Sequence, residues 1–97
     1  MHVISYKHIR EFVENHPDSG VRLGRWYKWM KKGKYANLNE LKAKFPEAEY
    51  VGNDRFVFNI GGNKYRLVAL INFKAQRTYV RFIGTHSEYN STDCKTI

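Results

Sequence analysis

The chain has 97 residues, of which 42% are hydrophobic, and this suits one domain over residues 1–97 with a single core. It has no run of about 18 apolar residues, so we expect no transmembrane helix and no membrane partner. The single cysteine, Cys94, excludes an internal disulfide and favours a reducing cytoplasm. The net charge of +8 favours a polyanionic partner such as RNA, DNA or an acidic protein, although solubility alone would also explain it.

The first part of the chain predicts a strand followed by two helices. The β-leaning run MHVIS (residues 1–5) predicts the strand. Ser5 is expected to cap a helix that continues to about His16, because apolar residues recur there at helical spacing. A second helix should run to about residue 32, and its candidate caps are Asp18 and Ser19.

A third, short helix and a run of strands should follow. Asn37 and Glu40 have the spacing of a capping box, and Pro46 ends this helical region. Short polar or glycine-containing links predict antiparallel hairpins after it. The sequence therefore predicts an α+β fold, with a twisted antiparallel sheet and helices packed on one face. The expected strands lie in EYVGND, RFVFNIGGN, KYRLVALINF and RTYVRFIGTH.

Strand alternation separates an expected core face from an expected site. Arg66 is a cation on a largely apolar strand, where a surface arginine is the competing interpretation. If residues 78–86 alternate strictly, one face carries Thr78, Val80, Phe82, Gly84 and His86, and the other carries Tyr79, Arg81, Ile83 and Thr85.

Polar side chains should collect at one end of this sheet. In an antiparallel hairpin the end of the last strand lies beside the start of the previous one, so His86 is expected near Lys64 and Arg66. The residues expected to gather there are Asn59, Asn63, Lys64, Arg66, Thr85, His86 and Tyr89.

This set suits metal-independent cleavage of RNA by its own 2′-hydroxyl. His86 can act as acid or base, and Arg66 and Lys64 can stabilise the charge on phosphorus. Tyr89 can stack a base or position a phosphate. A polar turn with an exposed histidine is the competing interpretation. The chain has no Gly-x-Ser-x-Gly, Walker loop or metal-ligand spacing, and GGNK suits a hairpin turn better than a phosphate loop.

The basic segment from Arg22 to Lys34 contains six positive charges and no negative one. It is either a solvated helix face or a non-specific surface for phosphates. The cations that we expect to contact RNA are Lys28, Lys31 and Lys32, together with Arg81 in the last strand.

Residues 56–89, FVFNIGGNKYRLVALINFKAQRTYVRFIGTHSEY, closely resemble the C-terminal half of HigB-type toxins of bacterial type II toxin–antitoxin systems. With the N-terminal strand and helices, the similarity covers essentially the whole chain. The resemblance implies the RelE-like fold and an endoribonuclease that cuts mRNA, usually in the A site of the 70S ribosome, and so arrests translation and growth. It also implies a HigA-type helix-turn-helix antitoxin, through which alone operator DNA would be contacted, and no cofactor.

The resemblance also implies roles for individual residues. Arg66 in KYRL, His86 in GTH and the nearby Tyr89 match functional positions of RelE-like toxins. Asn59 stands where many of these toxins have a lysine, which leaves charge stabilisation to Lys64 and Arg66. Two other classes of protein compete with this hypothesis: a non-catalytic RNA- or ribosome-binding module, and a regulatory protein that docks an acidic partner.

Overall fold

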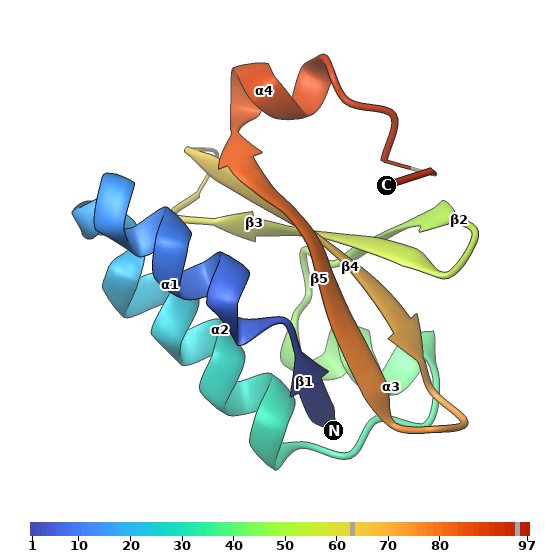
Figure 1. The fold of residues 1–97 in the computed structure, drawn as a ribbon. Helices are drawn as coiled ribbons and strands as arrows, with labels where there is room; N and C mark the ends of the chain where they lie inside the picture. Colours follow the sequence, from blue (N-terminus) through green and yellow to red (C-terminus); the bar gives the residue numbers. More distant parts are fainter. Residues whose placement is uncertain (63, 95) are drawn as a thin grey trace.

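The computed structural model describes residues 1–62, 64–94 and 96–97, and in that part of the chain helices precede a meander of strands (Figure 1). The N-terminal half holds β1 (His2–Ile4), α1 (Tyr6–Asn15), the short 3-10 helix η1 (Pro17–Ser19), α2 (Gly20–Lys32) and α3 (Leu38–Lys44). The C-terminal half holds β2 (Glu49–Gly52), β3 (Arg55–Ile60), β4 (Tyr65–Asn72), β5 (Arg77–Thr85) and α4 (His86–Asn90).

The strands form a five-stranded sheet in the order β1-β5-β4-β3-β2. The three pairs from β2 to β5 are antiparallel, as short links require. The α+β prediction is confirmed. The structure adds a parallel pair that the sequence did not predict, because β1 lies beside β5 with Val3 opposite Thr78. Since the helices and three strands separate β1 from β5 in the chain, no local turn signal could have revealed this pairing.

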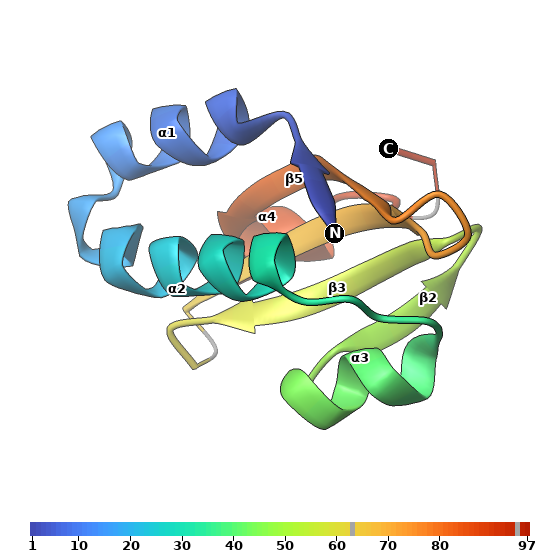
Figure 2. The same ribbon diagram turned by 90° about the horizontal axis from the view of Figure 1, so that it is seen from below.

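The helices α1, α2 and α3 pack on one face of the sheet (Figure 2). Leu23, Trp26 and Met30 recur at helical spacing along α2 and are buried. They share a core with alternate residues of β4, such as Leu67 and Ala69. Burial of this apolar surface is the main force that holds the helices on the sheet.

A β-bulge at Arg81 changes the faces of β5. Val68 pairs with Phe82, whereas the next residue, Ala69, pairs with Val80, so Arg81 is the extra residue. The strict alternation expected for residues 78–86 is therefore wrong after the bulge. The residues that face the helices are Thr78, Val80, Ile83 and Thr85, and those that face the opposite side are Tyr79, Phe82 and Gly84.

Local signals explain some helix ends and not others. The Asn37 side chain accepts a hydrogen bond from Glu40 N at 3.0 Å, which confirms the predicted cap of α3. Ser5 occupies the N-cap position of α1, as predicted, but it adopts a left-handed φ of 76° and its side chain makes no capping hydrogen bond. Within the described ranges, no helix is both long and apolar enough to span a membrane.

Candidate active site

The face of the sheet opposite α1, α2 and α3 carries a cross-strand row of Asn59, Arg66 and Gly84. Asn59 pairs with Arg66 across β3 and β4, and Arg66 pairs with Gly84 across β4 and β5. A Cβ at Gly84 would lie 2.5 Å from Cζ of Phe82, so only glycine allows the Phe82 ring to lie there. Arg66 therefore has a small neighbour on one side and an amide on the other.

Arg66 is half-buried in this row, below the ring of Tyr89 on α4. Its Cζ lies 5.8 Å from the centre of the Tyr89 ring. Its Nη1 is buried and has no hydrogen-bond partner among the described residues. Buried donors in folded proteins are nearly always paired, so an unpaired guanidinium N–H in a sheet face is suited to an anionic ligand.

The Tyr89 hydroxyl lies 3.9 Å from Sγ of Cys94, a weak sulfur hydrogen bond. Burial, and then this contact, raise the pKa of Tyr89 above its ordinary value of 10.0. The phenol is protonated at neutral pH, as in an ordinary tyrosine, and can donate a hydrogen bond.

The C-terminal segment folds back over the same face of the sheet. Arg55 donates to the backbone oxygen of Ile97 from Nε at 3.1 Å and from Nη2 at 2.8 Å. Arg55 precedes Val57 and Asn59 on the same side of β3, and Val57 is buried although it is not part of the helix-side core. Ile97 therefore lies on the same face of the sheet as Asn59 and Arg66.

The helix α4 begins directly where β5 ends, and a capping box fixes its first turn. Thr85 Oγ1 accepts from Glu88 N at 3.1 Å, and Glu88 Oε1 accepts from Thr85 N at 2.8 Å. The hydrogen bond from the Thr85 backbone is the largest cause of a lowered pKa of Glu88. This helix was not predicted from the sequence, although Thr85 and Glu88 have the spacing of a capping box.

His86 is the first residue of α4 and is exposed to solvent. Its Nδ1 lies 3.2 Å from Nδ2 of Asn90, one turn further along the helix. It precedes Tyr89 by three positions, a spacing that places the two side chains on neighbouring parts of one helix face. The structure thus brings together Asn59, Arg66 and Tyr89, with His86 at the exposed end of the same helix.

The structure places Lys64 on the helix side of the sheet. Its ammonium group forms an ion pair with Asp18 of η1. The Tyr65 hydroxyl donates to both carboxylate oxygens of Asp18, at 2.9 and 3.0 Å. The Lys64 hydrogen bond, and then that from Tyr65, lower the pKa of Asp18, and Asp18 raises the pKa of Lys64. The pairing crosses 46 positions of sequence, so sequence spacing could not predict it.

The remaining predicted site residues lie outside this cluster. Arg81 is exposed at the bulge, with its Cζ 5.8 Å from the Tyr79 ring. Asn63 lies outside the described residues. The Thr85 side chain is occupied by the cap of α4. Within the described ranges, no three His, Cys, Asp or Glu side chains come together as a metal site would require. Lys28, Lys31 and Lys32 are exposed on α2, and Arg22 and Arg25 of the same helix are exposed as well.

Comparison with known proteins gives concordant matches. A family model described as the HigB toxin, a RelE-like toxic component of a toxin–antitoxin system, matches residues 19–92. The mRNA interferase toxin HigB of Escherichia coli K12 is 34% identical over 93 residues, which cover 93% of this chain and 88% of that protein. The mRNA interferase HigB of Escherichia coli O6:H1 is 30% identical over 92 residues, which cover 93% of this chain and 89% of that protein.

Proposed function

The chain belongs to the HigB family of RelE-like toxins of toxin–antitoxin systems, and we propose that it is an endoribonuclease that cleaves mRNA. One observation of the site carries the proposal: the half-buried Arg66 has an unpaired Nη1 below the protonated phenol of Tyr89. Its relatives are named mRNA interferases, and the charge of +8 suits an RNA substrate.

Cleavage would proceed by attack of the RNA 2′-oxygen on the adjacent phosphorus. The P–O2′ bond forms, the P–O5′ bond breaks, and the products are a 2′,3′-cyclic phosphate and a 5′-hydroxyl. One protein group takes the 2′-hydroxyl proton and another protonates the departing 5′-oxygen. We assign these two proton transfers to His86 and Tyr89.

Arg66 would stabilise the negative charge that develops on the phosphoryl oxygens. Its Nη1 needs an acceptor, and a phosphoryl oxygen supplies one when the substrate binds. Asn59, its neighbour on β3, would hold the nucleotide with its amide. Lys64 would contribute less, because Asp18 holds its ammonium group on the helix side.

The partners of the toxin follow from this activity. We propose a HigA-type helix-turn-helix antitoxin as the neutralising protein and the ribosomal A site as the place of cleavage, with the exposed cations of α2 contacting RNA. The chain would then act in the cytoplasm, and operator DNA would be bound through the antitoxin.

The test compares Arg66→Ala and His86→Gln with Arg77→Ala, an exposed arginine at the other end of β5. Purified proteins are incubated with mRNA, with and without translating ribosomes and with and without EDTA, and the RNA ends are mapped. Arg66→Ala and His86→Gln should each slow cleavage by about 10²–10³-fold, whereas Arg77→Ala should cleave like the parent. Parental cleavage by a folded Arg66→Ala protein would rule out this site.

The non-catalytic alternative makes a different prediction in the same assay. An RNA- or ribosome-binding module would block translation without producing new RNA ends. The two variants would then inhibit translation as strongly as the parent.

A further inference from the structure

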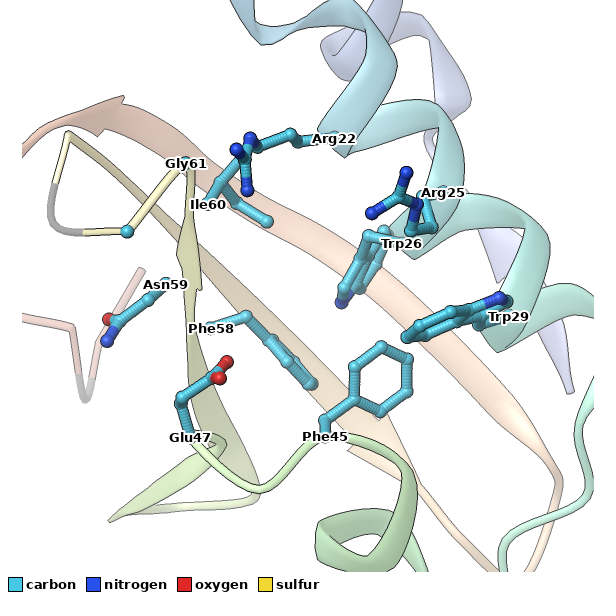
Figure 3. Close-up of a pocket in the computed structure, with 11 residues that line it drawn as sticks. Arg22, Arg25, Trp26, Trp29, Phe45, Glu47, Phe58, Asn59, Ile60 and Gly61 are labelled. Atoms are coloured by element: carbon cyan, nitrogen blue, oxygen red, sulfur yellow. The ribbon is translucent and has the colours of Figure 1, made fainter.

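A second concave site lies on the helix side of the sheet, where α2 faces the outer edge of β3. This α2–β3 pocket has a volume of about 380 Å³, within the range of pockets that hold small ligands. Aromatic rings of Trp26, Trp29, Phe45 and Phe58 line it (Figure 3). The rings of Trp26 and Phe45 each pack edge-on against Phe58, so these rings form a continuous aromatic part of the lining.

A buried donor in this lining lacks a partner. Trp26 is 3% exposed, and its Nε1 has no hydrogen-bond partner among the described residues. Figure 3 shows this nitrogen directed toward the space between Phe58 and Phe45. An unpaired buried N–H costs stability, so a ligand acceptor that reached this nitrogen on binding would recover that cost.

Two cations stand on the α2 side of the pocket. Arg22 and Arg25 both line it, and neither forms an ion pair within residues 1–62, 64–94 and 96–97. The Arg22 Cδ approaches Gly61 in the β3–β4 turn, where a Cβ would lie 3.7 Å away. Their guanidinium groups are thus suited to bind a phosphate. On the opposite wall, Glu47 supplies an acceptor for an amino group.

The pocket is open at the sheet edge and adjoins the Arg66 site. The last residue of β3 that pairs with β2 is Val57, which leaves the outer edge of residues 58–60 unpaired in the sheet. Asn59 borders the pocket, but its side chain points away to the other face of β3, where it neighbours Arg66 (Figure 3). Asn59 therefore lies between the α2–β3 pocket and the Arg66 site.

We infer that the α2–β3 pocket binds a nucleotide of the RNA strand that flanks the nucleotide at Arg66, with its base in the aromatic lining and its phosphate on Arg22 and Arg25. The inference rests on the proposed ribonuclease function and adds a substrate contact to it. Base–aromatic contacts of this kind accept any base, so the pocket would hold the strand without reading its sequence.

A nucleotide fits the lining better than a peptide side chain does. An apolar side chain would cover the rings and leave the Trp26 N–H unpaired. A carboxylate would satisfy the arginines and leave the rings uncovered. A nucleotide combines a flat ring bearing acceptors with an attached anion, and so satisfies the rings, the indole N–H and both arginines together.

The experiment uses a hexamer of 2′-O-methyl adenosine, which cannot be cleaved by 2′-attack. Both tryptophans of the chain line the pocket, so their fluorescence reports binding there directly. Arg22→Gln/Arg25→Gln is compared with Lys42→Gln/Lys74→Gln, which removes the same two charges from exposed positions away from the pocket. Affinities are measured by fluorescence anisotropy over a range of salt concentrations.

The hexamer should quench the tryptophan fluorescence of the parent. The double arginine variant should bind at least about tenfold more weakly, and the slope of log affinity against log salt should fall in magnitude by about 0.7, the contribution of the one phosphate that the two arginines share on a single strand. The lysine control should keep the parental slope. Trp26→Phe, which keeps a ring but removes the N–H, should weaken binding about two- to tenfold.

Further outcomes separate this inference from the proposed function. Arg66→Ala should lose cleavage yet retain hexamer-induced quenching, because it leaves the pocket intact. Unchanged affinity and slope in the double arginine variant would overturn the inference, whatever the cleavage assay gives. If that variant binds the hexamer normally but no longer binds purified antitoxin, the pocket docks a protein and the RNA inference is wrong.

Discussion

Arg66→Met should make the protein more stable and at the same time inactive. Arg66 is half-buried on an otherwise largely apolar strand, and its Nη1 has no partner among the described residues. Methionine has a similar length, is flexible and brings no buried donor. If the function of Arg66 is to bind substrate, its unpaired N–H lowers the free energy of unfolding of the protein without RNA.

The magnitude follows from two opposing contributions. Leaving a buried donor unsatisfied costs about 1–3 kcal/mol. The contact between the Arg66 guanidinium and the Tyr89 ring, at 5.8 Å, stabilises the fold by about 0.5–1 kcal/mol, and methionine would lose it. The net gain for Arg66→Met is therefore about 1 kcal/mol, which in a domain of this size raises Tm by roughly 4–8 °C.

The assay combines urea unfolding and thermal melting of the RNA-free protein with the cleavage assay. Arg77→Met, at an exposed position of β5, is the matched control and should change neither quantity appreciably. A loss of more than about 1 kcal/mol in Arg66→Met would show that the arginine holds the fold together, and the reasoning about its unpaired group would fail.

Three further predictions concern charges around the site. Because hydrogen bonds from Thr85 hold the pKa of Glu88 below its ordinary value of 4.5, Glu88 stabilises the fold above that pH, and the contribution is lost as pH falls through the lowered pKa. Glu88→Gln should thus flatten the acid side of a plot of urea midpoint against pH, and an unchanged plot would contradict the capping argument. Lys64→Gln should slow cleavage by less than about tenfold, because the exposed ion pair with Asp18 holds the Lys64 ammonium group away from Arg66. A loss of cleavage equal to that of Arg66→Ala would refute this prediction. Charge reversal at Lys28, Lys31 and Lys32 of α2 should weaken RNA binding and flatten its salt dependence, with little change in Tm. An unchanged salt slope would show that these residues serve solubility alone.

The helices and hairpins could be predicted because their signals are local. Helical spacing of apolar residues marked α1 and α2, and the Asn37 cap marked α3. Short turns defined the antiparallel order of β2 to β5. The prediction of a HigB-type toxin, made from residues 56–89, is confirmed by the family match.

The candidate site was harder to predict because non-local pairings shape it. The bulge at Arg81 moves Phe82 to the face of Arg66, and alternation alone cannot place a bulge. Asp18 draws Lys64 to the other face across a long stretch of chain. The α2–β3 pocket combines residues from a helix, a loop and a strand, so the arginines of α2 appeared in the sequence as part of a general basic surface.

Three buried polar atoms lack partners among the described residues, and two of them are donors on either side of β3. The third, Oε1 of Gln76, belongs to an amide whose nitrogen donates to the carbonyl oxygens of Tyr35 and Phe73, so backbone contacts determine its orientation. No such contact explains the N–H groups of Arg66 and Trp26. A polyanion is rich in acceptors, and an RNA strand that crosses the edge of β3 at Asn59 would meet both donors. RNA binding would then explain both unpaired N–H groups, each of which lowers the stability of the folded protein. The Arg66 site and the α2–β3 pocket are therefore best tested with the same oligonucleotide.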